Sequence, residues 1–347
     1  MGKPATRDGY NDQHTIDCER VLVTLLRGLG PWKESVYLVG GLTPRYLVAE
    51  RPPMVPAHAG TLDVDVVIDL QILADTDAYH TLEDNLKKMG FERAENDAGK
   101  KLSWRWQART EHGALMVLEL LADAPDIAGG KVQPLPTDGT ISALNIPHSA
   151  IVFDLHQVTE IQAELLGGNG VATEKVKHAN LVSFTCLKAF AFDQRFERKD
   201  AHDLVYCIEH AAEGMDAVGG AFREALAGKH AAVIQSALAI LRNRFAQDEK
   251  TEGYRKDDRS LWPGSRSTGT SRSTVRHVRC ASVRPVICWN NCSGVPASSS
   301  GKVLRRHTRL SWNSKSCSKP RFTLPICVSL MLTSLQSESM TPTACFT

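Results

Sequence analysis

Long apolar runs are missing from this 347-residue sequence. No stretch approaches the about 18 uninterrupted apolar residues of a membrane-spanning helix, so we expect no transmembrane segment. The opening Met-Gly-Lys-Pro-Ala-Thr-Arg-Asp has no apolar stretch of the kind found in signal peptides, and none is expected. Aromatic residues are few, at 6%, but 42% hydrophobic and 23% charged residues are ordinary for a globular protein. The composition excludes a wholly disordered or collagen-like chain.

Acidic residues are nearly absent from the last part of the chain. Residues 254–347 contain 15 Lys and Arg but only 3 Asp and Glu, whereas residues 1–253 contain 26 basic and 36 acidic residues. The net charge of +2 therefore combines an acidic body with a basic tail. Cysteine is also scarce in the body, where Cys18, Cys186 and Cys207 are scattered. This usage indicates a reduced, cytoplasmic protein.

Residues 254–347 also lack hydrophobic periodicity. They contain 18 serines, and no helix face can be drawn through them. A nucleic-acid-binding tail would need clustered Lys and Arg, and a zinc module would need paired ligands, of which Cys288 and Cys292 form one loose pair. Enrichment in Arg, Ser, Cys and Pro is typical of an out-of-frame reading of a GC-rich gene, which is the interpretation we favour. We expect this basic tail to be disordered.

The body shows clear periodicity. Helical spacing or capping residues predict helices over 17–29, 43–48 and 77–89. Short apolar or alternating runs predict strands over 36–39, 62–70, 91–95, 102–108 and 115–121. From residue 175 to about 247 the pattern is helical and rich in Ala and Leu.

These elements predict an α+β fold, with a mixed sheet flanked by helices and followed by a helical domain. We place the α/β domain at 1–130, a connecting segment at 131–174, and the helical domain at 175–253. The disordered basic tail takes the remainder, 254–347.

Three aspartates alternate with apolar residues over 62–70, so a strand would carry Asp63, Asp65 and Asp69 on one face. Asp63 and Asp65 would repel each other, and burial would raise their pKa values. A protein tolerates such a pair most readily where a divalent cation lies between the carboxylates. Carboxylate oxygens suit Mg²⁺ or Mn²⁺, and Mg²⁺ shares its remaining positions with waters and substrate phosphates.

A third acid, Glu119, lies inside the apolar run 115–121. A charge in such a run is unfavourable unless it is paired or binds a metal. If Glu119 lies on a strand beside Asp63 and Asp65, the three carboxylates predict a two-metal site. Such a site activates an attacking oxygen and stabilises a leaving pyrophosphate.

Gly40 and Gly41 end the apolar strand 36–39, directly before a predicted helix. Glycines at this point let the backbone approach a phosphate, and the N–H groups at a helix N-terminus can bind it. Arg45 lies one turn further and could add a charged contact.

Each of these elements alone has an ordinary explanation. An alternating Asp-Val-Asp is usually a solvated strand face, and a Gly-Gly pair is usually a turn. The ordered set of strand, Gly-Gly, helix, Asp-x-Asp and a later buried acid favours a functional site.

The ordered set resembles the nucleotidyltransferase superfamily that includes DNA polymerase β. The run 37–41, Tyr-Leu-Val-Gly-Gly, is similar to its glycine motif, and 63–67, Asp-Val-Asp-Val-Val, is similar to its metal-binding motif. A later segment resembles the AbiEii/AbiGii toxin-like nucleotidyltransferases. It comprises Leu-Lys-Ala-Phe-Ala at 187–191, followed by Arg195, Arg198-Lys199-Asp200 and Asp203-Leu204.

The resemblance implies roles for individual residues. Lys188 would contact the nucleoside triphosphate, and Asp200 would be the late acid, with Asp203 as the alternative. Thr43 stands two residues after Gly41, where many relatives have Ser or Thr directly after a glycine. An insert at 51–60 lengthens the spacing to the Asp-x-Asp motif. A solvated charged helix remains the ordinary explanation of the 188–203 segment.

The sequence and the resemblance together predict an enzyme. It would be a cytoplasmic, Mg²⁺-dependent (or Mn²⁺-dependent) nucleotidyltransferase that moves NMP from NTP to an acceptor hydroxyl on tRNA or a protein. The resemblance implies a toxin of a bacterial toxin–antitoxin or phage-defence pair, with a cognate antitoxin as partner. We expect no membrane association and no stable DNA binding.

Two alternatives stay open. A catalytically degenerate or truncated member of the fold would have no activity. A housekeeping tRNA nucleotidyltransferase has a Gly-Gly-x-x-Arg element, to which Gly40-Gly41-x-x-x-Arg45 is similar apart from one additional residue.

Overall fold

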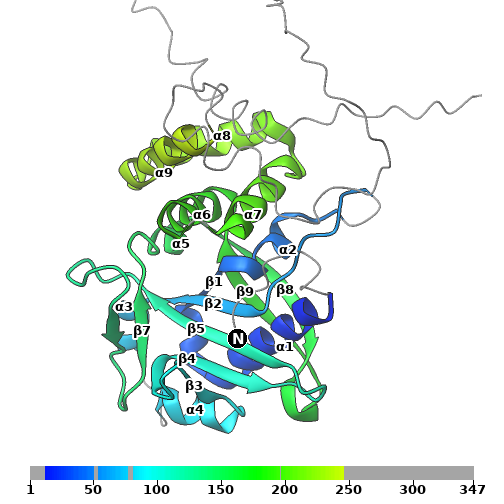
Figure 1. Cartoon of the computed structure of the whole chain (residues 1–347), viewed down its shortest axis with the longest axis vertical. Coiled ribbons are helices and arrows are strands. Elements are labelled where there is room, and N and C mark those ends of the chain that lie inside the picture. The colour runs from blue at the N-terminus through cyan, green and yellow to red at the C-terminus, as the bar shows by residue number, and fades with distance from the viewer. Residues whose placement is uncertain (1–11, 51–53, 77–80, 196, 246–347) are drawn as a thin grey trace, which may run out of the picture. The chain divides into compact units, whose positions relative to one another are not determined.

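A computed structural model describes residues 12–50, 54–76, 81–195 and 197–245 (Figure 1). These residues belong to one compact unit. The expected disordered tail, 254–347, lies outside the described residues, as does the end of the predicted helical domain. Among the described helices, none is both long and apolar enough to cross a membrane.

The described strands form one mixed sheet, so the α+β class expected from the sequence is confirmed. Its main path runs in the order β3-β4-β5-β2-β1-β9-β8, and β7 pairs with β5 and with β6. The strands are β1 (Val36–Val39), β2 (Asp63–Ile68), β3 (Glu92–Glu95), β4 (Lys101–Arg109), β5 (Leu115–Ala122), β6 (Val132–Pro134), β7 (Ser142–Asn145), β8 (His156–Glu164) and β9 (Val171–Ala179).

The central strand β2 has a different environment on each face. Its odd and even residues point to opposite faces, as the period of two requires. Val64 and Val66 are fully buried in the main core, together with apolar residues of helix α1 (Asp12–Leu29). Asp63 and Asp65 lie on the other face. Strand β2 is antiparallel to β1 and parallel to β5.

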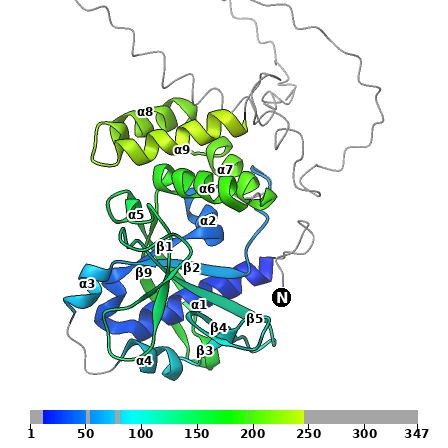
Figure 2. The same cartoon turned by 60° about the vertical axis from the view of Figure 1, so that its left-hand side comes forward.

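The helices divide between two further clusters. Helices α6 (Leu181–Arg195), α7 (Arg198–Glu209), α8 (Gly214–Leu226) and α9 (Ala231–Arg244) pack around Phe192 and Phe222, and Figure 2 shows them as a group. A third cluster joins Val67 of the sheet to Phe184 of α6 and Tyr206 of α7. The helical group is therefore attached to the face of β2 that carries the aspartates. The remaining helical segments are α2 (Pro44–Leu47), α3 (Leu70–Ala74), α4 (Leu82–Lys88), α5 (Ile151–Asp154) and three short 3-10 turns at Gly30–Ser35, Gly40–Leu42 and Leu166–Gly168.

The expected helical pattern from residue 175 is wrong at its start. Residues 175–179 belong to β9, which pairs antiparallel with β8 and parallel with β1. The period of two is hidden because polar Glu174 and His178 alternate with Val176 on the buried face. Glu174 is buried beside Lys33, 2.9 Å away, and Arg27, so its polarity reflects ion pairing and not exposure.

The expected grouping of Asp69 with Asp63 and Asp65 is also wrong. Strand β2 ends at Ile68, and the Asp69 carboxylate accepts hydrogen bonds from the backbone N–H groups of Gln71 and Ile72. Asp69 is therefore the N-cap of α3. The helix expected over 43–48 is likewise shorter, a single turn at Pro44–Leu47.

We expect the substitution Asp69→Ala to lower the free energy of unfolding by about 1 kcal/mol, because it removes the α3 cap. Urea titration followed by circular dichroism measures this change. Binding of Mn²⁺ to the same variant should be unchanged. Weakened Mn²⁺ binding would instead show that Asp69 belongs with Asp63 and Asp65 in the acidic site.

Candidate functional site

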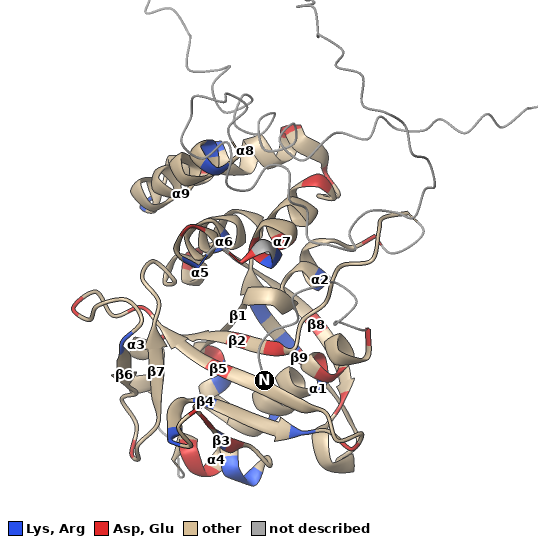
Figure 3. Ribbon diagram, in the orientation of Figure 1, with Lys and Arg blue, Asp and Glu red and all other residues tan. Residues whose placement is uncertain are grey.

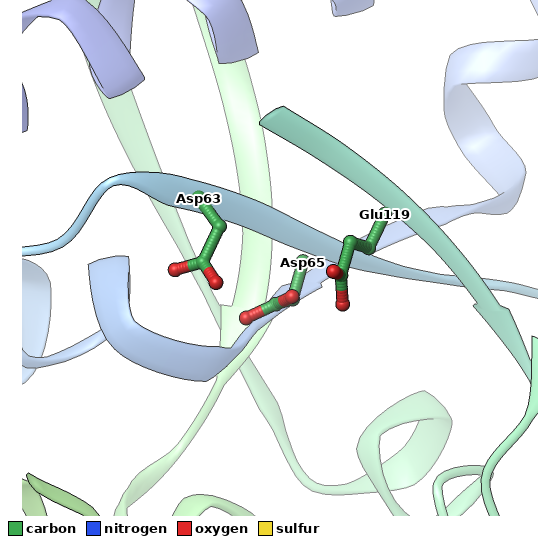
Figure 4. Close-up of side chains that lie close together, drawn as sticks. All are labelled: Asp63, Asp65 and Glu119. Carbon is green, nitrogen blue, oxygen red and sulfur yellow. The ribbon is translucent and has the colours of Figure 1, made fainter. Parts of the chain in front are cut away.

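Three carboxylates meet on one face of the sheet (Figure 4). Asp63 and Asp65 come from β2, and Glu119 comes from the neighbouring parallel strand β5, where it is paired in register with Asp65. One oxygen of each carboxylate lies within 4.8 Å of the other two. The juxtaposition expected from the sequence follows from this register, because the pairing of Asp65 with Glu119 places both side chains on the same face.

The surroundings of the triad fix two of its members. Asp63 is 7% exposed, and the Thr61 hydroxyl donates to its Oδ1 at 2.7 Å. Arg105 stands opposite Glu119 on β4 and forms an ion pair with it at 3.2 Å. Burial, and then the charges of Asp63 and Asp65, raise the pKa of the Cys18 thiol behind β2 well above its usual range.

This donor set fits a hard divalent cation. The three groups are carboxylates, which offer the oxygen ligands that Mg²⁺ and Mn²⁺ prefer. Three negative charges this close repel one another, and a divalent cation between them would offset that repulsion. The described residues place no thiolate or imidazole within the same group, so the triad is a candidate metal centre of all-oxygen type.

The turn after β1 lies directly against this centre. Gly40 has φ of +73°, and a Cβ atom built on it would lie 1.9 Å from Asp65 Oδ2. Both the backbone conformation and the space require glycine here. A Cβ atom on Gly41 would lie 2.7 Å from Thr61 Oγ1 and 3.1 Å from Lys199 Nζ. The two glycines therefore let the turn pass between the acids and a lysine of α7.

A pocket opens beside the triad and joins residues distant in the sequence. It is lined by Gly41, Leu62, Asp63, Asp65, Lys188, Arg195, Glu197, Lys199 and Asp200. The acids on β2 thus share one pocket with cations of α6 and α7. Figure 3 shows acidic positions on β2 and β5, and both basic and acidic positions on these two helices.

Ion pairs with two buried aspartates hold the cations of the pocket in place. Lys188 Nζ lies 2.8 Å from both Asp200 Oδ1 and Asp203 Oδ2. Arg195 donates two hydrogen bonds to Asp200, at 2.7 and 2.9 Å. Lys199 donates to both oxygens of Asp203, at 3.1 and 2.8 Å. Three cations thus share two carboxylates beside the triad, in a pocket that Glu197 also lines.

Electrostatics keep this network ionised. Burial opposes ionisation of Asp203, but the charges of Lys188 and Lys199 and a hydrogen bond from His58 outweigh it and hold the carboxyl pKa well below its usual range. Burial likewise opposes protonation of Lys188, and the charges of Asp200 and Asp203 raise its pKa above the ordinary value. Lys188 therefore stays protonated over the physiological pH range.

The structure brings together most, but not all, of the residues singled out in the sequence. Gly40, Gly41, Lys188 and Asp200 join the triad as described above. Thr43 is fully buried and is not among the residues that line the pocket. Arg45 does not line it either, and it forms an ion pair with Glu19 of α1 at 2.8 Å.

The late acid had two candidates, and their positions differ. Asp200 lines the pocket, whereas Asp203 is 0% exposed and lies behind Lys188 and Lys199. Sequence reasoning assigned no role to Arg195 or Lys199, although both lie within the charged segment quoted above. For Lys199 the signal was its position four residues before Asp203, one turn away on α7. Arg195 ends α6 and Asp200 lies in the first turn of α7, so no helical spacing marks that pair.

Sequence comparisons leave the chain without an assigned family. No protein-family model matches it, and no curated protein is significantly similar to it.

We expect Gly40→Ala to disturb the metal centre as well as the backbone. Gly99 is a matched control, because its φ of +72° is nearly the same and a Cβ atom there meets nothing within 4 Å. Gly99→Ala should lower the free energy of unfolding by about 1–2 kcal/mol from backbone strain alone. Gly40→Ala should cost more and should also weaken Mn²⁺ binding, measured by calorimetry. Equal effects of the two variants would show that Asp65 can move away.

We expect wild-type protein to bind Mn²⁺ and Mg²⁺ and Asp65→Asn to bind them about 10- to 100-fold more weakly, because a charged ligand at the centre of the triad is lost. Added Mn²⁺ should raise the melting temperature of wild type, since a ligand that binds the native state stabilises it. The variant should show little such rise. Asp69→Asn serves as the control, and its Mn²⁺ affinity should equal that of wild type.

Proposed function

We propose that this chain is a Mg²⁺-dependent nucleotidyltransferase that moves NMP from NTP to an acceptor hydroxyl. The observation that carries the proposal is the register of Asp65 against Glu119, which gathers three carboxylates beside a glycine turn. The three cations that line the pocket next to them, Lys188, Arg195 and Lys199, support the same activity, because a triphosphate needs positive charge as well as a metal.

The residues divide the work as follows. Asp63, Asp65 and Glu119 would hold the metal. When bound, Mg²⁺ would neutralise charge that develops on the phosphates. Gly41 admits the phosphate chain close to the backbone, and Lys188 and Lys199 lie beside it with their charges fixed by Asp203.

The reaction itself needs little from the protein beyond this arrangement. The acceptor oxygen forms a bond to the α-phosphorus, the bond from that phosphorus to the bridging oxygen breaks, and pyrophosphate and the hydroxyl proton are released. Catalysis consists of positioning and of electrostatic stabilisation by groups that are already in place.

The resemblance of the motifs also suggests a biological role for this activity. We infer a cytoplasmic toxin of a toxin–antitoxin or phage-defence pair that modifies tRNA or a protein. The arrangement of Lys188 and Asp200 in one pocket supports this branch of the superfamily, because both residues stand in the segment that carries the resemblance.

Transfer of label from each α-labelled NTP, in the presence of Mg²⁺, into a mixture of total RNA and protein tests the proposal. We expect label in one acceptor class with wild type. Asp63→Ala combined with Asp65→Ala should reduce it to background, because the metal ligands are lost. Asp69→Ala, in the same part of the chain but outside the triad, should retain transfer. A folded wild type that binds Mn²⁺ but transfers no label would favour the catalytically degenerate alternative.

A further inference from the structure

The segment that leads into β2 makes a specific contact with α7. His58 Nε2 lies 2.9 Å from Asp203 Oδ1, and the backbone N–H of Gly60 donates to His58 Nδ1 at 3.1 Å. A neutral imidazole carries one ring proton, and Nδ1 acts as acceptor here, so Nε2 carries the proton and donates it to Asp203. Burial lowers the pKa of His58, which favours this neutral form.

A second set of contacts strengthens the attachment. The Tyr206 hydroxyl of α7 donates to the backbone carbonyl of Pro56 at 3.1 Å. The His58 ring lies 4.9 Å from the Tyr206 ring and 5.6 Å, stacked, from the His202 ring, measured between centroids. Both hydrogen bonds and aromatic contacts therefore hold the segment around His58 against α7.

Asp203 connects His58 to the lysines of the pocket. It is fully buried and does not line the pocket, but Lys188 and Lys199 do, and both donate to it. Lys199 Nζ in turn lies 3.1 Å from the position of a Cβ atom on Gly41. A chain of direct contacts thus runs from His58 through Asp203 to a lysine beside the glycine turn.

We propose that His58 is a positioning residue for phosphate binding, which acts through Asp203 to hold Lys199, with Lys188, at the pocket. The inference rests on the proposed function for the identity of the phosphate, the triphosphate of NTP. His58 belongs to the insert 51–60, which lengthens the spacing between the glycine turn and the Asp-x-Asp motif. The described part of this insert, residues 54–60, therefore contributes to the site through His58.

Binding of the magnesium complex of inorganic tripolyphosphate, measured by calorimetry, tests the inference without catalysis. His58→Phe keeps a ring on Tyr206 but loses the donor to Asp203, and we expect about tenfold weaker binding, the size of one hydrogen bond to a charged group. His58→Gln keeps an N–H donor at a similar reach and should recover most of the affinity. The matched control is His210→Phe, because His210 also contacts Tyr206, at 5.0 Å, without an interaction with Asp203 in the described structure. It should bind as wild type does.

Equal affinity of wild type and His58→Phe would overturn the inference, and so would absence of binding to wild type. The label-transfer assay separates this result from the proposed function. Tripolyphosphate binding that depends on His58, without NMP transfer, would reject the enzyme and keep the positioning role. If transfer occurs, His58→Phe should raise the KM for NTP about tenfold and leave kcat within about twofold, as expected for lost uniform binding.

A measurement on wild type covers the case in which His58→Phe does not fold. Nitrogen-15 NMR should show His58 in the form protonated at Nε2. Addition of magnesium tripolyphosphate should shift this Nε2 resonance, because Lys199 would share its charge between Asp203 and the phosphate. An unchanged resonance at saturating tripolyphosphate would overturn the inference.

Discussion

The repulsion among three carboxylates is the constraint on which the site depends. At separations below 4.8 Å, each pair of charges repels by about 3–4 kcal/mol at an effective dielectric constant of about 20. The fold offsets this because β2 is a central strand, paired on both edges, with Val64 and Val66 in the main core. Because core packing holds the acids close together, binding of a cation between them would relieve their repulsion and would be favourable. The sheet therefore serves as the rigid support of a charged centre.

A second electrostatic arrangement lies across the pocket and has the opposite sign. Lys188 is buried between Asp200 and Asp203, and removal of one partner from such a buried pair costs about 3–5 kcal/mol. The network ties α6 to α7 and fixes where their cations stand relative to β2. The two arrangements depend on each other: Asp65 raises the pKa of Arg195, after the larger effect of Asp200. The pocket therefore brings acids and cations side by side.

The sequence predicted the parts whose signals are local and periodic. Strands β1, β2 and β5 follow from apolar runs, and an acid inside such a run stands out, so Asp63, Asp65 and Glu119 could be grouped before the structure. Strand β9 was not predicted, because its inward residue Glu174 is polar and is paired with cations from distant segments. The contact of His58 with Asp203 was not predicted for a related reason. Its partner is 145 residues away, and no periodicity marks a single histidine in a loop.

Glu174 and the acids of the triad differ in how the fold balances their charge. Glu174 is held directly by two cations, Lys33 and Arg27, which is how a fold stabilises one carboxylate within its interior. The triad instead gathers three acids around one point, next to Gly40 in a conformation that other residues adopt only with strain. Both features are unfavourable for folding, and they coincide in space, because a Cβ atom on Gly40 would lie 1.9 Å from Asp65 Oδ2. Folding alone gives no reason for that coincidence, whereas binding of a cation and a phosphate gives a reason for each.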